Sequence, residues 1–133
     1  MSREAQEALQ GARVVRGRIV TDRLAAKIYN ASKIGLNVHH PQARWSGLNT
    51  RTFELLASGL FQVVDRVHGL EELLTPDAEV VCYSTPQEAV KLCKRYLADP
   101  SARTKIAQRG RERVLAEHTY LSRMRTLCDL ARG

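Results

Sequence analysis

Arg51 and Glu54 are the residues whose types and spacing are best suited to chemistry. They lie three residues apart in the segment NTRTFELLASG (49–59), so they share a face if this segment is a helix. A glycine-containing loop before a helix allows backbone N–H groups and a guanidinium to approach a phosphate, and a carboxylate can accept hydrogen bonds from a sugar diol. The pair therefore predicts a nucleotide site. The alternative is an ordinary helix start with a surface Arg–Glu pair.

The elements that must position this pair alternate along the chain. The sequence predicts strands over 13–20, 34–39, 61–65 and 79–84, and helices over 4–10, 22–31, 50–58, 69–74, 86–98, 100–117 and from Thr119 onward. This alternation predicts an α/β fold, with a parallel sheet of three to four strands flanked by helices. Ligands of such sheets bind at the carboxyl ends of strands, beside helix N-termini. The loop 40–49 is therefore the predicted binding region.

Apolar spacing predicts which side of each helix faces the core. The strand over 34–39 alternates, with Asn37 and His39 on the side opposite its apolar residues. Gly59 is the expected residue after the helix 50–58. The residues expected to point inward from the three amphipathic helices are Leu24 and Ile28; Phe53, Leu56, Ala57 and Leu60; and Leu121, Met124, Leu127 and Cys128.

Composition bounds the class of protein. The 133 residues suffice for one domain, and the net charge of +7 suits an anionic partner or a solvated basic surface. Arg and Lys are spread around the last helices, which favours a solvated or membrane-surface face over nucleic-acid binding. Three widely spaced cysteines predict buried free thiols in a reducing cytosol. No run is apolar enough for a signal peptide or a membrane span, so we expect a cytoplasmic protein, or one peripheral to the membrane.

The run KIGLNVHHPQARWSGLNTRTFELLASGLFQVVD (33–65) resembles the GT-B glycosyltransferases. It is most similar to the spore-maturation and spore-coat-type glycosyltransferase-like proteins. The shared pattern is a strand KI-x-LN, a loop, N-x-R-x-FE-x-x-A-x-G and a strand that ends in Asp. The tail continues the resemblance through YLADP, IA-x-x-G-x-x-x-V and HTY-x-x-R, so that it covers about residues 13–130.

The resemblance implies a partial C-terminal, Rossmann-like, donor-binding half of a GT-B fold. By this resemblance Glu54 binds the donor ribose, the loop from Gly47 to Arg51 lies beside the diphosphate, and Arg51 with the helix amides stabilises the leaving diphosphate as the catalytic group. Lys33 contacts phosphate or merely favours the end of the preceding helix. No D-x-D element is present, so no metal is implied and the nucleotide sugar is substrate rather than cofactor. The predicted donor-binding residues are Gly47, Asn49, Arg51, Glu54, Asn37 and Lys33.

The other polar residues receive structural interpretations. His118, Tyr120 and Arg123, in HTY-x-x-R, are expected to form a corner between the last two helices. Trp45 lies in the binding loop, where it stacks on a ligand or anchors the loop.

The sequence also departs from the resembling pattern. Many retaining relatives carry an acid eight residues before the ribose glutamate, where this chain has Ser46. The acceptor domain and the first strands of the donor domain have no counterpart. We therefore expect 1–133 to be a single partial donor-binding domain, with an irregular 1–20, an α/β part over 21–98 and C-terminal helices over 99–133. The strand 34–39 would expose an edge, which favours self-association.

Two functions follow from this reading. In the first, the chain binds a nucleotide diphosphate sugar and transfers the sugar with an upstream acceptor-binding domain or chain. In the second, it is a non-catalytic nucleotide-binding or protein-interaction fragment of a glycosyltransferase. Whether the chain is an enzyme is left open, and we expect no transfer by this chain alone.

Overall fold

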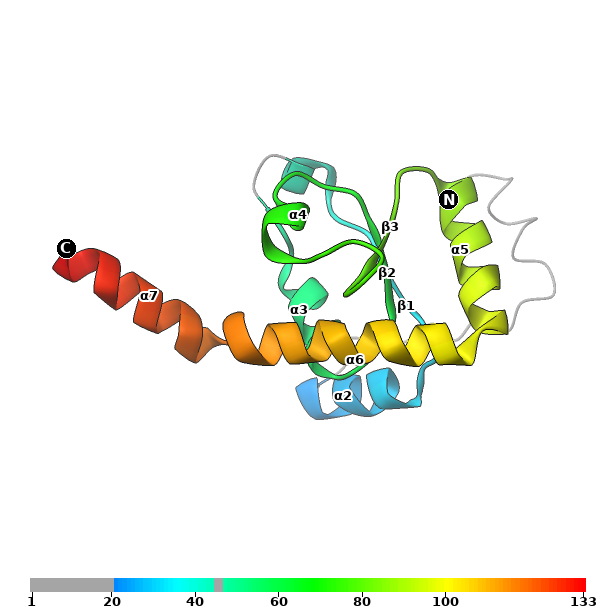
Figure 1. Cartoon of the computed structure of the whole chain (residues 1–133), viewed down its shortest axis with the longest axis horizontal. Coiled ribbons are helices and arrows are strands. Elements are labelled where there is room, and N and C mark those ends of the chain that lie inside the picture. Colours follow the sequence, from blue (N-terminus) through cyan, green and yellow to red (C-terminus); the bar gives the residue numbers. More distant parts are fainter. Residues whose placement is uncertain (1–20, 45–46) are drawn as a thin grey trace.

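The computed structural model describes residues 21–44 and 47–133 (Figure 1). The predictions for 4–10 and 13–20, and those for Trp45 and Ser46, fall outside these residues. In chain order the elements are α2 (Asp22–Ala31), β1 (Gly35–Asn37), the 3₁₀ helix η1 (Pro41–Arg44), α3 (Thr50–Ala57), β2 (Gln62–Asp65), α4 (Leu70–Leu73), β3 (Val81–Tyr83), α5 (Pro86–Ala98), α6 (Pro100–Glu117) and α7 (Tyr120–Arg132).

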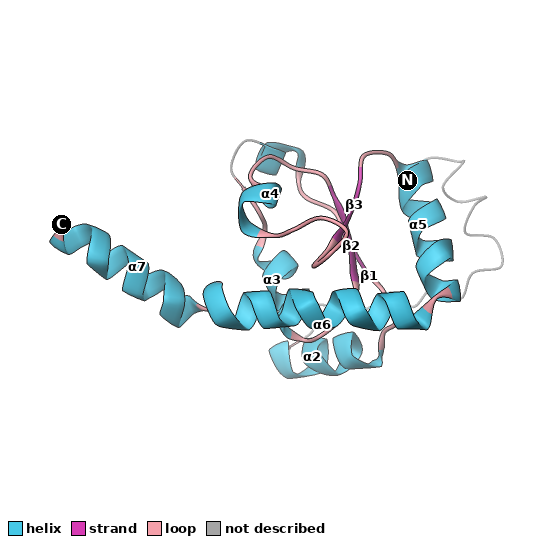
Figure 2. Ribbon diagram, viewed as in Figure 1, coloured by secondary structure: helices cyan, strands magenta, loops and turns pink. Residues whose placement is uncertain are grey.

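The three strands form one parallel sheet in the order β1-β2-β3. The register places Leu36 beside Val63, and Val63 beside Val81. Figures 1 and 2 show α3 and α4 on one side of the sheet, α5 on the other, and α6 running across the domain. The predicted α/β class with a parallel sheet of three to four strands is therefore confirmed, with strands shorter than the sequence pattern indicated.

The core consists of two apolar clusters, one on each face of the sheet. Successive strand residues point to opposite faces, so β2 contributes Val64 to one cluster and Val63 to the other. The first cluster joins α3 and α4 to the sheet through Leu56 and Leu70, and the second joins α5 through Tyr96. Helix α6 contributes to both clusters and so holds the two layers together.

Helix α3, which carries the predicted site, has clear local stop and start signals. Asn49 caps its amino end by accepting a hydrogen bond from the Thr52 N–H at 3.0 Å. At its carboxyl end Gly59 has φ +74°, and the Leu60 N–H donates to the Leu55 carbonyl at 3.0 Å. This is a Schellman arrangement, which confirms Gly59 as the residue that ends the helix.

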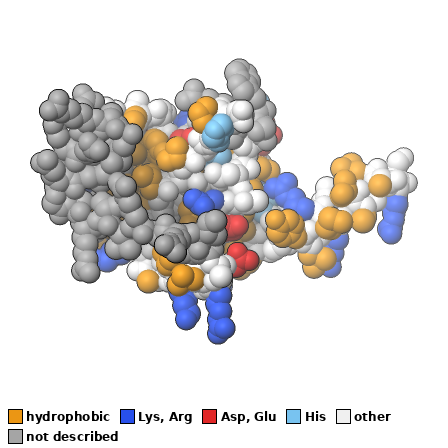
Figure 3. All heavy atoms as spheres, turned by 180° about the vertical axis from the view of Figure 1, so that it is seen from behind, with side chains coloured by type: hydrophobic (Ala, Val, Ile, Leu, Met, Phe, Trp, Pro, Cys, Tyr) orange, Lys and Arg blue, Asp and Glu red, His pale blue; other side chains and the backbone are white. Residues whose placement is uncertain are grey.

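Two of the three predicted inward faces are wrong. Leu24 and Ile28 of α2 are 47% and 46% exposed. Figure 1 shows that helix α7 projects away from the body, and Figure 3 shows apolar side chains at the surface of this projection. The predicted inward residues of α7 are exposed: Leu121, Met124, Leu127 and Cys128. An amphipathic pattern indicates a face that packs on something, but within the described residues nothing covers these two faces.

The apolar side of β1 is also exposed. Leu36 and Val38 are 55% and 64% exposed, whereas Asn37 and His39 are buried. Leu36 shares a face of the sheet with Val63, and α5 covers that face over β2 and β3 only. The buried side of β1 is therefore its polar side. Among the described residues no helix is long and apolar enough to cross a membrane.

Candidate nucleotide site

A pocket of about 430 Å³ opens at the amino end of α3. This end of α3 lies at the carboxyl edge of the sheet, because Asn37 at the end of β1 is hydrogen-bonded to Asn49 and Thr52 at the start of α3. The size is typical of ligand sites, which commonly hold a few hundred cubic ångströms. The lining residues come from the loop before α3, from α3, from α4 and from the corner between α6 and α7: Gly47, Leu48, Thr50, Phe53, Glu54, Leu73, His118, Tyr120 and Arg123.

Glu54 and Gly47 are the predicted donor residues that line this pocket. Glu54 is exposed, and no hydrogen bond or ion pair joins its carboxylate to another described residue. Gly47 has φ +93°, a left-handed conformation in which a side chain would be strained, so glycine suits the turn that brings the backbone to the pocket. Glu54 therefore presents a carboxylate with no partner among the described residues to a pocket that Thr50, the first residue of α3, also lines.

Arg51 does not lie in this pocket. It lines a separate hollow between α2, β1 and α3, together with Tyr29 and Leu36. Residues three apart on a helix differ by about 60° around its axis, so they can share a face and still border different hollows. Of the predicted pair, only Glu54 therefore lines the pocket. Both residues also border α2, Arg51 in this hollow and Glu54 in a neighbouring one that shares Ala25 and Tyr29 with it.

Lys33 is also remote from Glu54. It precedes β1 and lines a pocket with Gly59, Arg103 and Arg111. This pocket lies at the amino end of the strands, because both Lys33 and Gly59 come just before a strand. Lys33 thus lines a different pocket from Glu54, and its contact with the donor phosphate stays a prediction.

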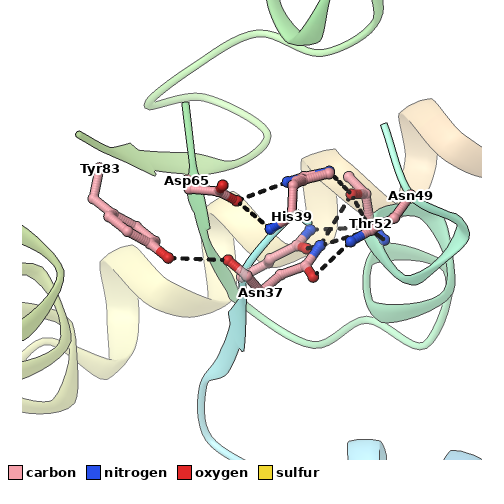
Figure 4. Close-up of polar contacts among 7 residues, drawn as sticks. Asn37, His39, Asn49, Thr52, Asp65 and Tyr83 are labelled. Atoms are coloured by element: carbon pink, nitrogen blue, oxygen red, sulfur yellow. Dashed lines mark hydrogen bonds and ion pairs between the residues drawn. The ribbon is translucent and has the colours of Figure 1, made fainter. Parts of the chain in front are cut away.

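Asn37 and Asn49 belong to a buried polar network beneath the pocket (Figure 4). The Asn37 side-chain nitrogen donates to Asn49 Oδ1 and Thr52 Oγ1 at 3.0 Å each, and to Gln62 Oε1 at 3.1 Å. Asn49 Nδ2 returns a bond to Asn37 Oδ1 at 3.1 Å, and the Gln62 amide donates to the Thr52 carbonyl. These two asparagines fasten the start of α3 to β1 and β2, so they position the pocket rather than line it.

His39 and Asp65 extend this network to the end of β2. The backbone N–H of His39 donates to Asp65 Oδ1 at 2.9 Å, and its ring Nδ1 lies 2.7 Å from the same oxygen. The His39 side chain is fully buried, while that of Asp65 is 23% exposed. On the other side of the ring, Nε2 lies 3.4 Å from Thr52 Oγ1. Asp65 therefore orients His39, and His39 supports Thr52 in the first turn of α3.

Sequence reasoning missed His118, Tyr120 and Arg123 as pocket residues. They form the expected corner, but this corner also lines the pocket, together with Gly47 and Leu48 of the loop before α3. His118 Nε2 lies 2.9 Å from the Leu73 carbonyl and its ring is 5.5 Å from that of Phe53. The motif HTY-x-x-R was a signal for this role, because it places a histidine, a tyrosine and an arginine together at the start of a helix.

No three His, Cys, Asp or Glu side chains within the described segments come together in a way that could hold a metal ion. Asp65 and His39 do not line the pocket, and their side chains are hydrogen-bonded to each other. Among the described lining residues, the groups available for chemistry therefore include the Glu54 carboxylate, the Arg123 guanidinium, the His118 imidazole and the amides at the start of α3.

The fold is similar to that of solved glycosyltransferase structures. Sucrose-phosphate synthase from Thermosynechococcus elongatus matches with a TM-score of 0.74 and 23% identity, over 98% of this chain and 33% of that one. The C-terminal domain of a glycosyl transferase group 1 family protein from Francisella tularensis matches with a TM-score of 0.68 and 18% identity, over 88% of this chain and 62% of that one. At these identities the likeness shows the fold, and the chain spans only part of either structure.

A comparison with curated proteins finds no match. The model of the family described as glycosyl transferase-like matches residues 3–129. That range covers almost all of the 133 residues, and it includes the pocket and the buried network beneath it. The narrower spore-coat-type resemblance stays a prediction. The chain therefore belongs to the glycosyl transferase-like family, and its three-stranded parallel α/β architecture corresponds to part of the C-terminal half of a GT-B fold.

Proposed function

We propose that this chain binds a nucleotide diphosphate sugar in the pocket around Glu54 and that, together with an acceptor-binding domain, it transfers the sugar. One observation carries the proposal: a carboxylate with no partner among the described residues lines a pocket at the amino end of a helix, in a chain of the glycosyl transferase-like family. Carboxylates bind sugar diols as hydrogen-bond acceptors, and helix N-termini favour phosphate. The same pocket thus offers a hydrogen-bond acceptor to the ribose and hydrogen-bond donors to the diphosphate.

The proposed pose follows from which groups are free. The Glu54 carboxylate accepts from the ribose hydroxyls, because no other described residue occupies it. The diphosphate faces Gly47 and the Thr50 N–H, where the backbone is close and the helix end carries partial positive charge. Phe53 and Leu73 offer an apolar wall to the base. During transfer these donors would stabilise the charge that develops on the departing diphosphate.

Calorimetric titration with the diphosphates of uridine, guanosine, thymidine and cytidine tests donor binding. We expect one nucleotide to bind, and Glu54→Gln to weaken it by about 1.5–3 kcal/mol, since a hydrogen bond to a charged group is lost. Glu72→Gln is the matched control, because Glu72 is exposed and lies outside the pocket. Equal affinity in Glu54→Gln, or no binding of any nucleotide by the wild type, contradicts the proposal.

The position of Arg51 can be tested in the same titration. We expect Arg51→Gln to weaken nucleotide binding less than Glu54→Gln does, because Arg51 lines the hollow beside α2. An equal or larger loss in Arg51→Gln would favour the sequence-based prediction that Arg51 binds the diphosphate.

The lack of a D-x-D element predicts that nucleotide binding needs no divalent cation. Titrations in EDTA and in Mg²⁺ test this prediction, and the affinity should be the same in both.

The alternative function is a nucleotide-binding or interaction fragment that transfers nothing. The chain spans 33% of the sucrose-phosphate synthase structure, so transfer by the whole protein is a proposal that an assay must test. Assays of sugar transfer separate the two functions when the chain is tested alone and with an added acceptor-binding half. We expect sugar transfer only when the acceptor-binding half is added. If no transfer occurs in either assay, the result supports the non-catalytic fragment.

The predicted self-association is tested separately by light scattering, which compares the mass in solution with the chain mass of 14.9 kDa.

A further inference from the structure

We infer that Arg123, at the corner between α6 and α7, is the cation of the Glu54 pocket and binds the diphosphate group of the ligand. The inference deepens the proposed function and rests on it for the identity of the nucleotide. It assigns a ligand contact to a residue that the sequence pattern placed in a purely structural corner. Two features of the pocket support it: the way Arg123 is held, and the absence of an ion pair with Glu54.

Arg123 is held toward the pocket by two aromatic side chains. Its guanidinium carbon lies 5.7 Å from the centre of the Phe53 ring, in a cation–π arrangement, and its Nη2 lies 3.4 Å from His118 Nδ1. The other ring nitrogen of His118 donates to the Leu73 carbonyl at 2.9 Å, which leaves Nδ1 as an acceptor for Arg123. The guanidinium has five N–H groups, so most of them remain available to a ligand.

Arg123 and Glu54 line the same pocket without neutralising each other. Both belong to the lining, yet no ion pair within 4.0 Å joins them. Opposite charges that share a pocket but remain apart suit a ligand with two complementary groups. A nucleoside diphosphate has them, because its hydroxyls donate to a carboxylate and its phosphate oxygens accept from a guanidinium. Arg123 would thereby supply a positive charge that neither Arg51 nor Lys33 brings to the pocket.

The competing role for Arg123 is to attach α7 to α3 without touching a ligand. A contact with Phe53 and His118 alone would serve that role. The two roles differ in which ligands respond to a mutation. A residue that binds phosphate affects nucleoside diphosphates and inorganic pyrophosphate but not the nucleoside. A residue that only attaches the helix affects all ligands of the pocket alike.

The test compares Arg123→Gln with Arg125→Gln in the full chain. Arg125 is an exposed arginine two residues along the same helix and does not line the pocket, so the two variants have the same net charge. Each is titrated with the nucleoside diphosphate that the wild type binds, with the matching nucleoside and with inorganic pyrophosphate. We expect Arg123→Gln to weaken diphosphate and pyrophosphate binding by about 10-fold to 100-fold, the usual loss for a hydrogen bond between charged groups. The nucleoside should be unaffected.

A further variant, Arg123→Lys, keeps the charge but not the fork of donors, and we expect it to recover part of the affinity. Thermal unfolding of each variant verifies that the chain is folded. Equal losses for nucleoside and diphosphate in Arg123→Gln would overturn the inference in favour of helix attachment. Unchanged diphosphate affinity in Arg123→Gln, beside a loss in Glu54→Gln, would overturn it and leave the proposed donor site intact.

A wild-type chain that binds no nucleotide would defeat the proposed function but not yet the anion site. In that case pyrophosphate decides, with the backbone amide signals of Gly47 and Thr50 followed by NMR. Pyrophosphate shifts that disappear in Arg123→Gln and persist in Arg125→Gln support the inference. Shifts that are absent in the wild type, or equal in both variants, overturn it.

Discussion

The Asn37 side chain shows how a buried polar residue can support a site without lining it. Its amide group is 2% exposed and bonds to Asn49, Thr52 and Gln62, so it links two strands to the first turn of α3. Among the described residues no buried side-chain nitrogen or oxygen lacks a partner. A complete network of this kind holds one geometry, because any rearrangement would leave a polar group unpaired in a medium of low dielectric.

We expect Asn37→Ala to lower the free energy of unfolding by about 1–3 kcal/mol, because the buried partners of Asn37 lose their bonds. Urea denaturation measures the change, and nucleotide affinity should fall in the folded variant as the start of α3 loosens. Asn30→Ala, at an exposed position of α2, is the control and should change stability by less than about 0.5 kcal/mol. Equal stability of the two variants would mean that the network does not hold the site.

The cysteines differ in their environments and should differ in reactivity. All three are free, but Cys82 is buried, Cys93 is partly buried and Cys128 is exposed, which corrects the prediction of three buried thiols. Burial raises the pKa of the Cys82 thiol to about 11, with a smaller opposing effect from Arg66. The thiolate is the reactive form, so the raised pKa and the burial both lower the reactivity of Cys82.

At pH 8 we therefore expect iodoacetamide to modify Cys128 first and Cys82 last. The rate at Cys82 should rise with pH up to about 11, the pKa of its thiol, because the thiolate fraction grows until then. Mass spectrometry of timed samples locates the modified residue, and Cys128→Ser should remove the fast phase. Similar rates for Cys82 and Cys128 in the folded chain would contradict the buried position of Cys82.

At the scale of elements, α6 determines how closely the layers pack. Gly110 lies where α6 crosses the segment before β3, and a Cβ there would come within 2.3 Å of the Glu79 carbonyl oxygen and 2.8 Å of a Leu56 methyl group. The first of these neighbours is backbone and cannot move aside. Glycine is therefore required at this crossing by space, although it lowers the helix propensity of α6.

We expect Gly110→Ala to destabilise the chain by about 1–3 kcal/mol, since overpacking against backbone outweighs the gain in helix propensity of about 1 kcal/mol. Arg109→Ala, at the exposed neighbouring position, is the control and should stay within about 0.5 kcal/mol of the wild type. Urea unfolding monitored by circular dichroism compares them. A more stable Gly110→Ala would show that α6 lies farther from Glu79 than the structure has it.

At the scale of the whole molecule, stability comes from the two clusters on the sheet and not from α7. Leu56 is fully buried in one cluster, whereas Leu127 of the projecting helix is 59% exposed. We expect Leu56→Ala to cost about 2–5 kcal/mol and Leu127→Glu to cost less than about 0.5 kcal/mol. Urea unfolding of both variants tests this difference. A large loss in Leu127→Glu would show that α7 packs on the chain in solution.

The sequence by itself determined the order and ends of the elements, because these depend on neighbouring residues. Gly59 after α3 and the start of α7 at Thr119 were both readable, since a helix end and the residue that marks it are adjacent in the chain. The parallel α/β class followed from the same local pattern, and Glu54 was readable as a candidate ligand from its spacing to Arg51 and from the motif around it.

Only the tertiary structure decided which faces are covered and which side chains meet. An amphipathic pattern shows that a helix has an apolar face, but not whether anything lies against it, so the exposed faces of α2 and α7 could not be foreseen. That Glu54 lines the pocket and Arg51 does not depends on which elements pack around the start of α3. Arg123 reaches the pocket from a distant part of the chain, because long-range packing of α6 carries the corner to α3.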